Sequence, residues 1–102
     1  LPITLPSQKT NELHAMHLYV IECERRDELL EYLRSKNVGA SLHYPLAGHQ
    51  HAAYANRIRG GDDVPMTEIF YRKNLTLPIF PQLSDENVDH IISTVLSWFA
   101  SL

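Results

Sequence analysis

The last fifth of the chain holds the pattern that most restricts its fold, an amphipathic helix with a clear start. Ser84 is a good N-cap, and Asp85 and Glu86 follow in the first turn, where the helix dipole favours negative charge. Apolar side chains then share one helical stripe: Val88, Ile91, Ile92, Val95, Leu96 and Phe99. A helix with such a stripe must bury it, so the chain must supply a second layer.

Three short apolar segments predict the strands of that layer. Residues 17–23 contain a β-prone run and predict a buried strand. Residues 40–44 alternate polar and apolar side chains, and Pro45 ends the predicted strand. Residues 75–81 are apolar and extended, but Pro78 lacks an N–H donor, so this segment predicts an edge strand or one that ends early.

Two further helices are predicted between these strands. Asp27 opens the first, and Asn37 or Gly39 is suited to the left-handed conformation that ends it. Asp63 is a candidate cap for the second, with Pro65 in its first turn and with Glu68 and Arg72 spaced for an ion pair. Before it, residues 49–54 predict one or two helical turns.

The element order is therefore β, α, β, a loop with short helices, α, β, α. It predicts an α+β fold in two layers, a three-stranded sheet with helices packed on one face. The chain has 102 residues, enough for one small domain, which we place over 17–102. Residues 1–16 hold two prolines and no clear period, so they predict a linker or an arm that enters from a missing large domain.

Charge and composition exclude some partners. Nine Lys+Arg against 12 Asp+Glu give a net charge of −3 without a basic block, which argues against nucleic acid. No apolar run approaches the roughly 20 residues that a membrane span needs. The lone Cys23 has no internal disulfide partner, which favours a reducing compartment, and we expect a cytoplasmic protein.

The histidines raise the question of a metal site. There are six, and His43, His49 and His51 fall in one region. A zinc site needs three or four ligands about 2 Å from the ion, and no Cys or carboxylate stands at a supporting spacing. Loop histidines are the simpler interpretation, so we predict no metal.

No catalytic residue is predicted in this chain. Cys23 lies at the end of an apolar strand, where a buried thiol is ordinary. Ser41 and His43 lack an orienting carboxylate. The lysines fall in polar or exposed contexts, unlike a Schiff-base lysine: Lys9, Lys36 and Lys73.

Several short motifs, in order, resemble one known family. They are His17-Leu18-Tyr19-Val20-Ile21, Arg26-Asp27-Glu28-Leu29, Val38-Gly39-Ala40-Ser41-Leu42-His43-Tyr44-Pro45, His49, Ala53-Tyr54, Asp63-Val64-Pro65-Met66-Thr67-Glu68, Leu75-Thr76-Leu77-Pro78-Ile79-Phe80-Pro81 and Leu83-Ser84-Asp85-Glu86. With the final helix, roughly residues 12–96 resemble the C-terminal part of DegT/DnrJ/StrS-type sugar aminotransferases.

The resemblance implies the small domain of a fold-type-I enzyme that depends on pyridoxal phosphate (PLP). Such enzymes transfer an amino group, usually from glutamate or glutamine, to a keto group on a nucleotide-linked sugar. It also implies that the Schiff-base lysine and the cofactor contacts belong to a preceding large domain. The segment alone is then expected to bind no cofactor and to be inactive, and its partners are that large domain and a second subunit of a homodimer.

The same resemblance implies substrate-binding roles for three residues. His43 and Tyr44 match the family's His-Tyr-Pro strand end, and His49 matches its downstream histidine. Their implied role is hydrogen bonding and stacking to the nucleotide-sugar; packing for Tyr44 and a loop surface for the histidines remain the alternative. This chain has Ala47-Gly48-His49 where members often have Pro-Leu-His, which predicts a more mobile loop.

Two other functions stay open at this point. One is a sugar dehydratase of the same family, in which histidine replaces the lysine. The other is a stand-alone binding module with the same fold. The small-domain hypothesis predicts an exposed apolar patch where the large domain packs, whereas a binding module would cover its apolar positions.

Overall fold

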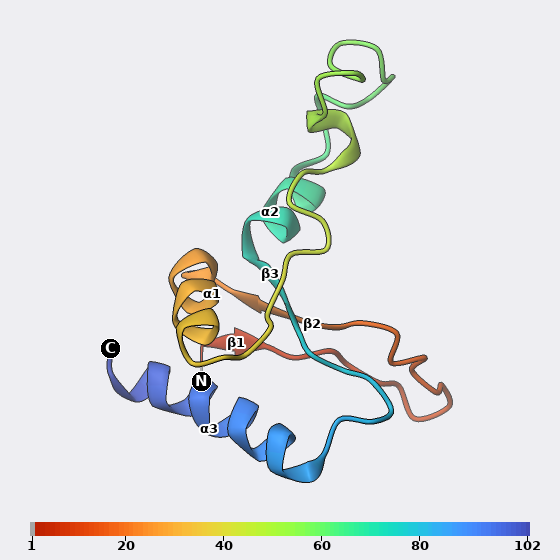
Figure 1. Ribbon diagram of the computed structural model, residues 1–102. Coiled ribbons are helices and arrows are strands. Elements are labelled where there is room, and N and C mark those ends of the chain that lie inside the picture. Colours follow the sequence, from red (N-terminus) through yellow and green to blue (C-terminus); the bar gives the residue numbers. More distant parts are fainter. Residues whose placement is uncertain (1) are drawn as a thin grey trace.

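Three short antiparallel strands and three α-helices make up the computed structural model, which describes residues 2–102 (Figure 1). The sheet has the order β1-β2-β3. In chain order the elements are β1 (Ile3–Thr4), β2 (Tyr19–Cys23), α1 (Arg26–Ser35), the 3-10 turn η1 (Gly48–Gln50), α2 (Pro65–Lys73), β3 (Asn74–Leu77) and α3 (Asp85–Ala100). The predicted α+β class and the three-stranded sheet are confirmed.

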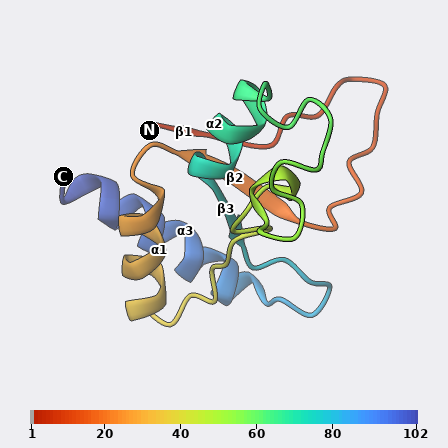
Figure 2. The same cartoon turned by 90° about the horizontal axis from the view of Figure 1, so that it is seen from above.

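One face of the sheet carries the core. The register sets Ile3 opposite Cys23, Tyr19 opposite Leu77 and Ile21 opposite Leu75, so all six side chains point to the same face. Helices α1 and α3 lie side by side against it, as Figure 2 shows from above. They contribute these buried side chains: Leu29, Leu30, Leu33, Val95 and Trp98. Full burial of one such aliphatic side chain contributes ~2 kcal/mol, so this face stabilises the domain.

The membership of the sheet differs from the prediction in two places. The third strand is β1, which the sequence placed in the arm over 1–16. The strand predicted over 40–44 is reduced to a single bridge, in which Ser41 and Thr76 exchange both backbone hydrogen bonds, at 3.1 and 2.8 Å.

The outer edge of β3 explains why that bridge does not extend into a strand. Past Thr76 on one side lies Pro78, which has no N–H to donate. On the other side lies Asn74, whose N–H bonds to Phe70 and whose carbonyl accepts from Arg26 at 3.0 Å. Both neighbouring positions are therefore closed to a partner strand.

The helix ends follow local capping rules, with two shifts of one residue: α1 begins at Arg26 rather than at Asp27, and the cap of α2 also moves. Ser84 Oγ accepts from the N–H of Asn87 at 3.2 Å, which confirms the predicted cap of α3. Asn37, with φ 61°, takes the left-handed position after α1, while Val38 N–H bonds to Leu33 O at 2.9 Å. The cap of α2 is Val64 rather than Asp63, because Pro65 occupies the first helical position.

The α3 stripe is only partly covered. Val95 and Trp98 are buried, and Trp98 was absent from the predicted stripe. Ile92 remains 51% exposed and Leu96 47% exposed. Half of the predicted stripe, Val88, Ile92 and Leu96, thus stays exposed. Within residues 2–102, no helix is both long and apolar enough to cross a membrane.

Residues 43–64 leave the sheet together with α2 and extend away from α1 and α3 (Figure 1). We call residues 43–64 the projecting segment. It contains η1 and a series of turns where the sequence predicted one or two helical turns over 49–54.

Candidate functional site

His43 lies at the base of the projecting segment, two residues after Ser41, which forms the bridge to β3. Its Nδ1 is 3.0 Å from Thr76 Oγ1, in a partly buried hydrogen bond. The backbone bridge between Ser41 and Thr76 brings the two side chains together. The imidazole is therefore held at one nitrogen by the sheet.

Tyr44 follows directly and has a different environment. Its ring packs edge-on against His43, with centroids 5.7 Å apart, and the peptide bond between the two residues is cis. The side chain is 64% exposed, so the intrachain contacts leave most of the ring open. An exposed aromatic ring on a fixed base is suited to stacking on a ligand.

His43 also lines a cavity of about 530 Å³ next to the sheet. The walls come from the residues that follow α1, from the end of β3 and the segment after it, and from the start of α3. Several polar residues are among them: Asn37, Ser41, Thr76, Asn87 and His90. The volume lies in the range of small-molecule sites, about 300–1,000 Å³.

His49 lies further out, on η1. Its Nε2 is 3.2 Å from Glu68 Oε1 on α2, and its side chain is only 13% exposed. Gly61, near the end of the projecting segment, lies close to His49: a Cβ added to Gly61 would be 3.1 Å from the Cβ of His49. His49, Tyr54 and Ile58 line a separate cavity of about 380 Å³.

The three predicted site residues thus occupy two places. His43 and Tyr44 are in contact at the base of the projecting segment, whereas His49 lines a different cavity. The sequence also paired Glu68 with Arg72, and this is wrong, because Glu68 reaches His49 instead. Thr76 and Glu68 were missed as partners of the histidines, since only the fold brings them together.

Cys23 and Ser41, which the sequence did not favour as nucleophiles, lie in structural positions. Cys23 is buried in the core, and this burial raises the pKa of its thiol above the ordinary 9.0, which disfavours the thiolate. Ser41 contributes its backbone to the bridge with Thr76. Among residues 2–102, no three His, Cys, Asp or Glu side chains converge as metal ligands would.

Sequence comparisons match this chain to one protein family and to individual relatives. Residues 1–96 match the DegT/DnrJ/EryC1/StrS aminotransferase family. The chain is 39% identical over 93 residues to the erythromycin biosynthesis sensory transduction protein EryC1 of Saccharopolyspora erythraea, covering 91% of the chain and 25% of that protein. It is 34% identical over 98 residues to the dTDP-3-amino-3,4,6-trideoxy-alpha-D-glucose transaminase of Streptomyces venezuelae, covering 96% and 25%.

Solved structures match the same region. DesV of S. venezuelae superposes with a TM-score of 0.89 at 33% identity, over 96% of this chain and 26% of that one. The PMP form of Spr1654 of Streptococcus pneumoniae has a TM-score of 0.80 at 27% identity, over 94% of this chain and 25% of that one. The chain spans about a quarter of the length of the relatives it matches. It belongs to the DegT/DnrJ/EryC1/StrS aminotransferase family.

Proposed function

We propose that this chain is the small domain of a PLP-dependent aminotransferase that moves an amino group from glutamate or glutamine to a keto group on a nucleotide-linked sugar. The observation that carries the proposal is the fit to DesV, which covers 96% of this chain at 33% identity. The transaminase relative from Streptomyces venezuelae supports the sugar class. The lone buried Cys23 favours a cytoplasmic protein.

The large domain is proposed to supply the catalytic lysine and the PLP contacts. When bound, PLP acts as the electron sink of transamination. The three lysines of this chain do not fit its Schiff base, which calls for a desolvated amine. Lys9 is exposed beside Glu12, Lys36 lies 5.6 Å from the Tyr32 ring centroid, and Lys73 pairs with Glu24.

The projecting segment is proposed to bring its side chains to the substrate. Tyr44 offers an exposed ring for stacking, and His43 is held beside it through Thr76. His49 is proposed to add a hydrogen bond further out, where Glu68 fixes its Nε2. Stacking and hydrogen bonding of this kind bind the nucleotide-sugar without moving a proton at the reacting carbon.

An apolar groove on α3 is proposed as the surface that packs against the large domain. It has a volume of about 470 Å³, and its wall includes Ile3, Leu5, Val88, Ile92 and Leu96. An open apolar surface of this kind marks an interface. A second subunit is proposed to complete a homodimer.

The test uses the full-length protein with PLP, an amino donor and nucleotide-linked keto-sugars. We expect the cofactor absorbance to change on addition of glutamate or glutamine, and an aminated sugar to appear by mass spectrometry. Tyr44→Ala should raise the KM for the sugar by about tenfold, the loss of one stacking contact of ~1.4 kcal/mol, and leave the donor step unchanged. Leu13→Ala, at a 91% exposed side chain outside the candidate site, is the control. A protein that aminates no nucleotide-linked sugar would contradict the proposal.

A further inference from the structure

Helix α2 carries Glu68, yet the hydrophobic core does not determine where this helix points. None of its nine residues, Pro65–Lys73, is buried. A helix this short is marginal by itself, and its direction is normally set by an apolar face packed on a core. Polar contacts at its C-terminal end therefore help to set its direction.

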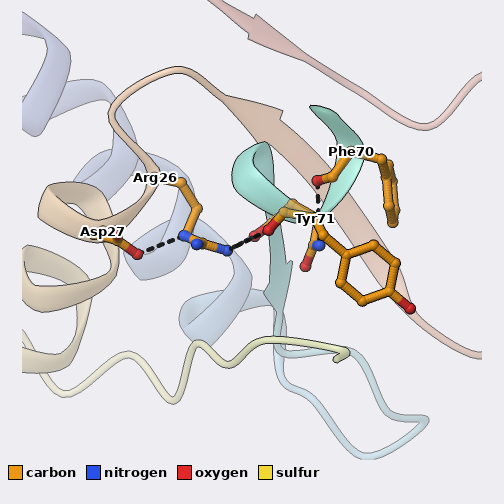
Figure 3. Close-up of polar contacts among 5 residues, drawn as sticks. Arg26, Asp27, Phe70 and Tyr71 are labelled. Carbon is orange, nitrogen blue, oxygen red and sulfur yellow. Dashed lines mark hydrogen bonds and ion pairs between the residues drawn. The ribbon is translucent and has the colours of Figure 1, made fainter. Parts of the chain in front are cut away.

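The C-terminal end of α2 meets a largely buried arginine from the start of α1. Arg26 Nη1 donates to the Tyr71 carbonyl at 3.2 Å and to the Asn74 carbonyl at 3.0 Å (Figure 3). Its Nε lies 2.6 Å from Asp27 Oδ1, and the Arg26 side chain is 12% exposed. A guanidinium is well matched to this position, because the last carbonyls of a helix carry its negative partial charge.

Two further contacts surround Arg26. The fully buried Asn74 donates from Nδ2 to the Phe70 carbonyl at 3.2 Å. Lys73 forms an ion pair with Glu24, in the turn between β2 and α1. The end of α2 is thus joined to the start of α1, and Arg26 is the one side chain among these that reaches two carbonyls.

The direction of α2 matters for the site because Glu68 lies one turn before Tyr71. Glu68 Oε1 is the partner of His49 Nε2 at 3.2 Å. A rotation of α2 about its C-terminal end would move Glu68 and separate this pair. The Arg26 contact is thereby linked to the position of the projecting segment.

We infer that Arg26 is a positioning residue, which orients α2 through the Tyr71 and Asn74 carbonyls and thereby holds His49 in place through Glu68. The consequence for substrate binding rests on the proposed function. The Arg26 contacts do not depend on the proposed function, because they join elements within residues 2–102.

Hydrogen–deuterium exchange of the full-length protein tests the inference. In Arg26→Met, which keeps the length of the side chain and removes the donors, we expect the amides of 66–73 to exchange about tenfold faster, while β2 and α3 keep their rates. Arg26→Lys should restore part of the protection. Arg25→Met is the matched control, because Arg25 pairs with Glu28 and lies over Trp98, away from α2.

The inference is overturned if exchange over 66–73 stays at the wild-type rate in Arg26→Met, or if it rises equally in β2 and α3, as in a general loss of stability. The KM for the nucleotide-sugar, measured on the same variants, separates the two proposals. Faster exchange with a raised KM and an unchanged kcat supports both. Faster exchange with a wild-type KM supports the positioning role of Arg26 and overturns the role of His49 in the proposed function.

Discussion

His49 and Glu68, 19 residues apart in the chain, meet with Nε2 and Oε1 separated by 3.2 Å. This contact joins the projecting segment to α2, and it is the one side-chain hydrogen bond found between them in the described part of the chain. It therefore ties the segment to the helix that follows it.

Removal of this contact should weaken substrate binding and leave chemistry intact. For Glu68→Ala in the full-length protein, we expect the KM for the nucleotide-sugar to rise about three- to tenfold, the effect of one partly exposed hydrogen bond, with kcat near wild type. Steady-state kinetics measure both constants. Glu31→Ala, at an exposed position of α1, is the control. A drop in kcat with an unchanged KM would show that the contact serves another step.

Gly61→Ala should disturb the same contact from the other side. The new methyl would lie 3.1 Å from the Cβ of His49 and 3.4 Å from the Ile58 carbonyl, so His49 must shift. We expect a loss of about 1 kcal/mol in the free energy of unfolding. We expect this shift to weaken the contact between His49 and Glu68, so the effect on KM should not add to that of Glu68→Ala. At Gly48 the added Cβ meets no atom within 4 Å, so Gly48→Ala should leave stability near wild type. Equal effects of the two glycine substitutions would contradict this account.

The buried thiol of Cys23 predicts a loss of stability at high pH. Because burial raises its pKa, the folded chain keeps the thiol proton at a pH where the unfolded chain, with a pKa near 9.0, has lost it. This contribution is therefore complete below pH 9.0 and decreases above it, by at most about 1.4 kcal/mol per pH unit. Urea unfolding of wild type and Cys23→Ala, at neutral and alkaline pH, should show their difference change above pH 9.0. A constant difference would mean that the thiol titrates alike in both states.

The open groove of α3 predicts that the isolated 102-residue chain self-associates. Ile92 and Leu96 are about half exposed, next to each other on the helix. The double substitution Ile92→Lys/Leu96→Lys should restore a monomer, whereas Ser97→Lys, at an exposed position on another side of α3, should not. Gel filtration over a range of concentrations measures the outcome. A wild-type chain that is monomeric throughout would argue against a docking surface and favour a stand-alone module.

Local signals predicted the features that depend on neighbouring residues. The Ser84 cap and the left-handed Asn37 need only a few adjacent positions, and both are confirmed. Pairing between distant segments could not be predicted in the same way. Ile3–Thr4 has no strand signal of its own and pairs because β2 offers it a free edge.

The same limit applies to the candidate site. The motif marked His43 and His49, but their partners Thr76 and Glu68 come from elements 33 and 19 residues away. Glu68 had a plausible neighbour at helical spacing, Arg72, and the choice between the two partners depends on the path of the projecting segment.

Borohydride reduction of the full-length protein, followed by peptide mass spectrometry, tests whether the PLP-binding lysine lies outside this chain. We expect a pyridoxyl group on one lysine that lies outside these 102 residues, with Lys9, Lys36 and Lys73 unmodified. A pyridoxyl group on one of these three lysines, or no pyridoxyl lysine in a PLP-loaded protein, would contradict this expectation.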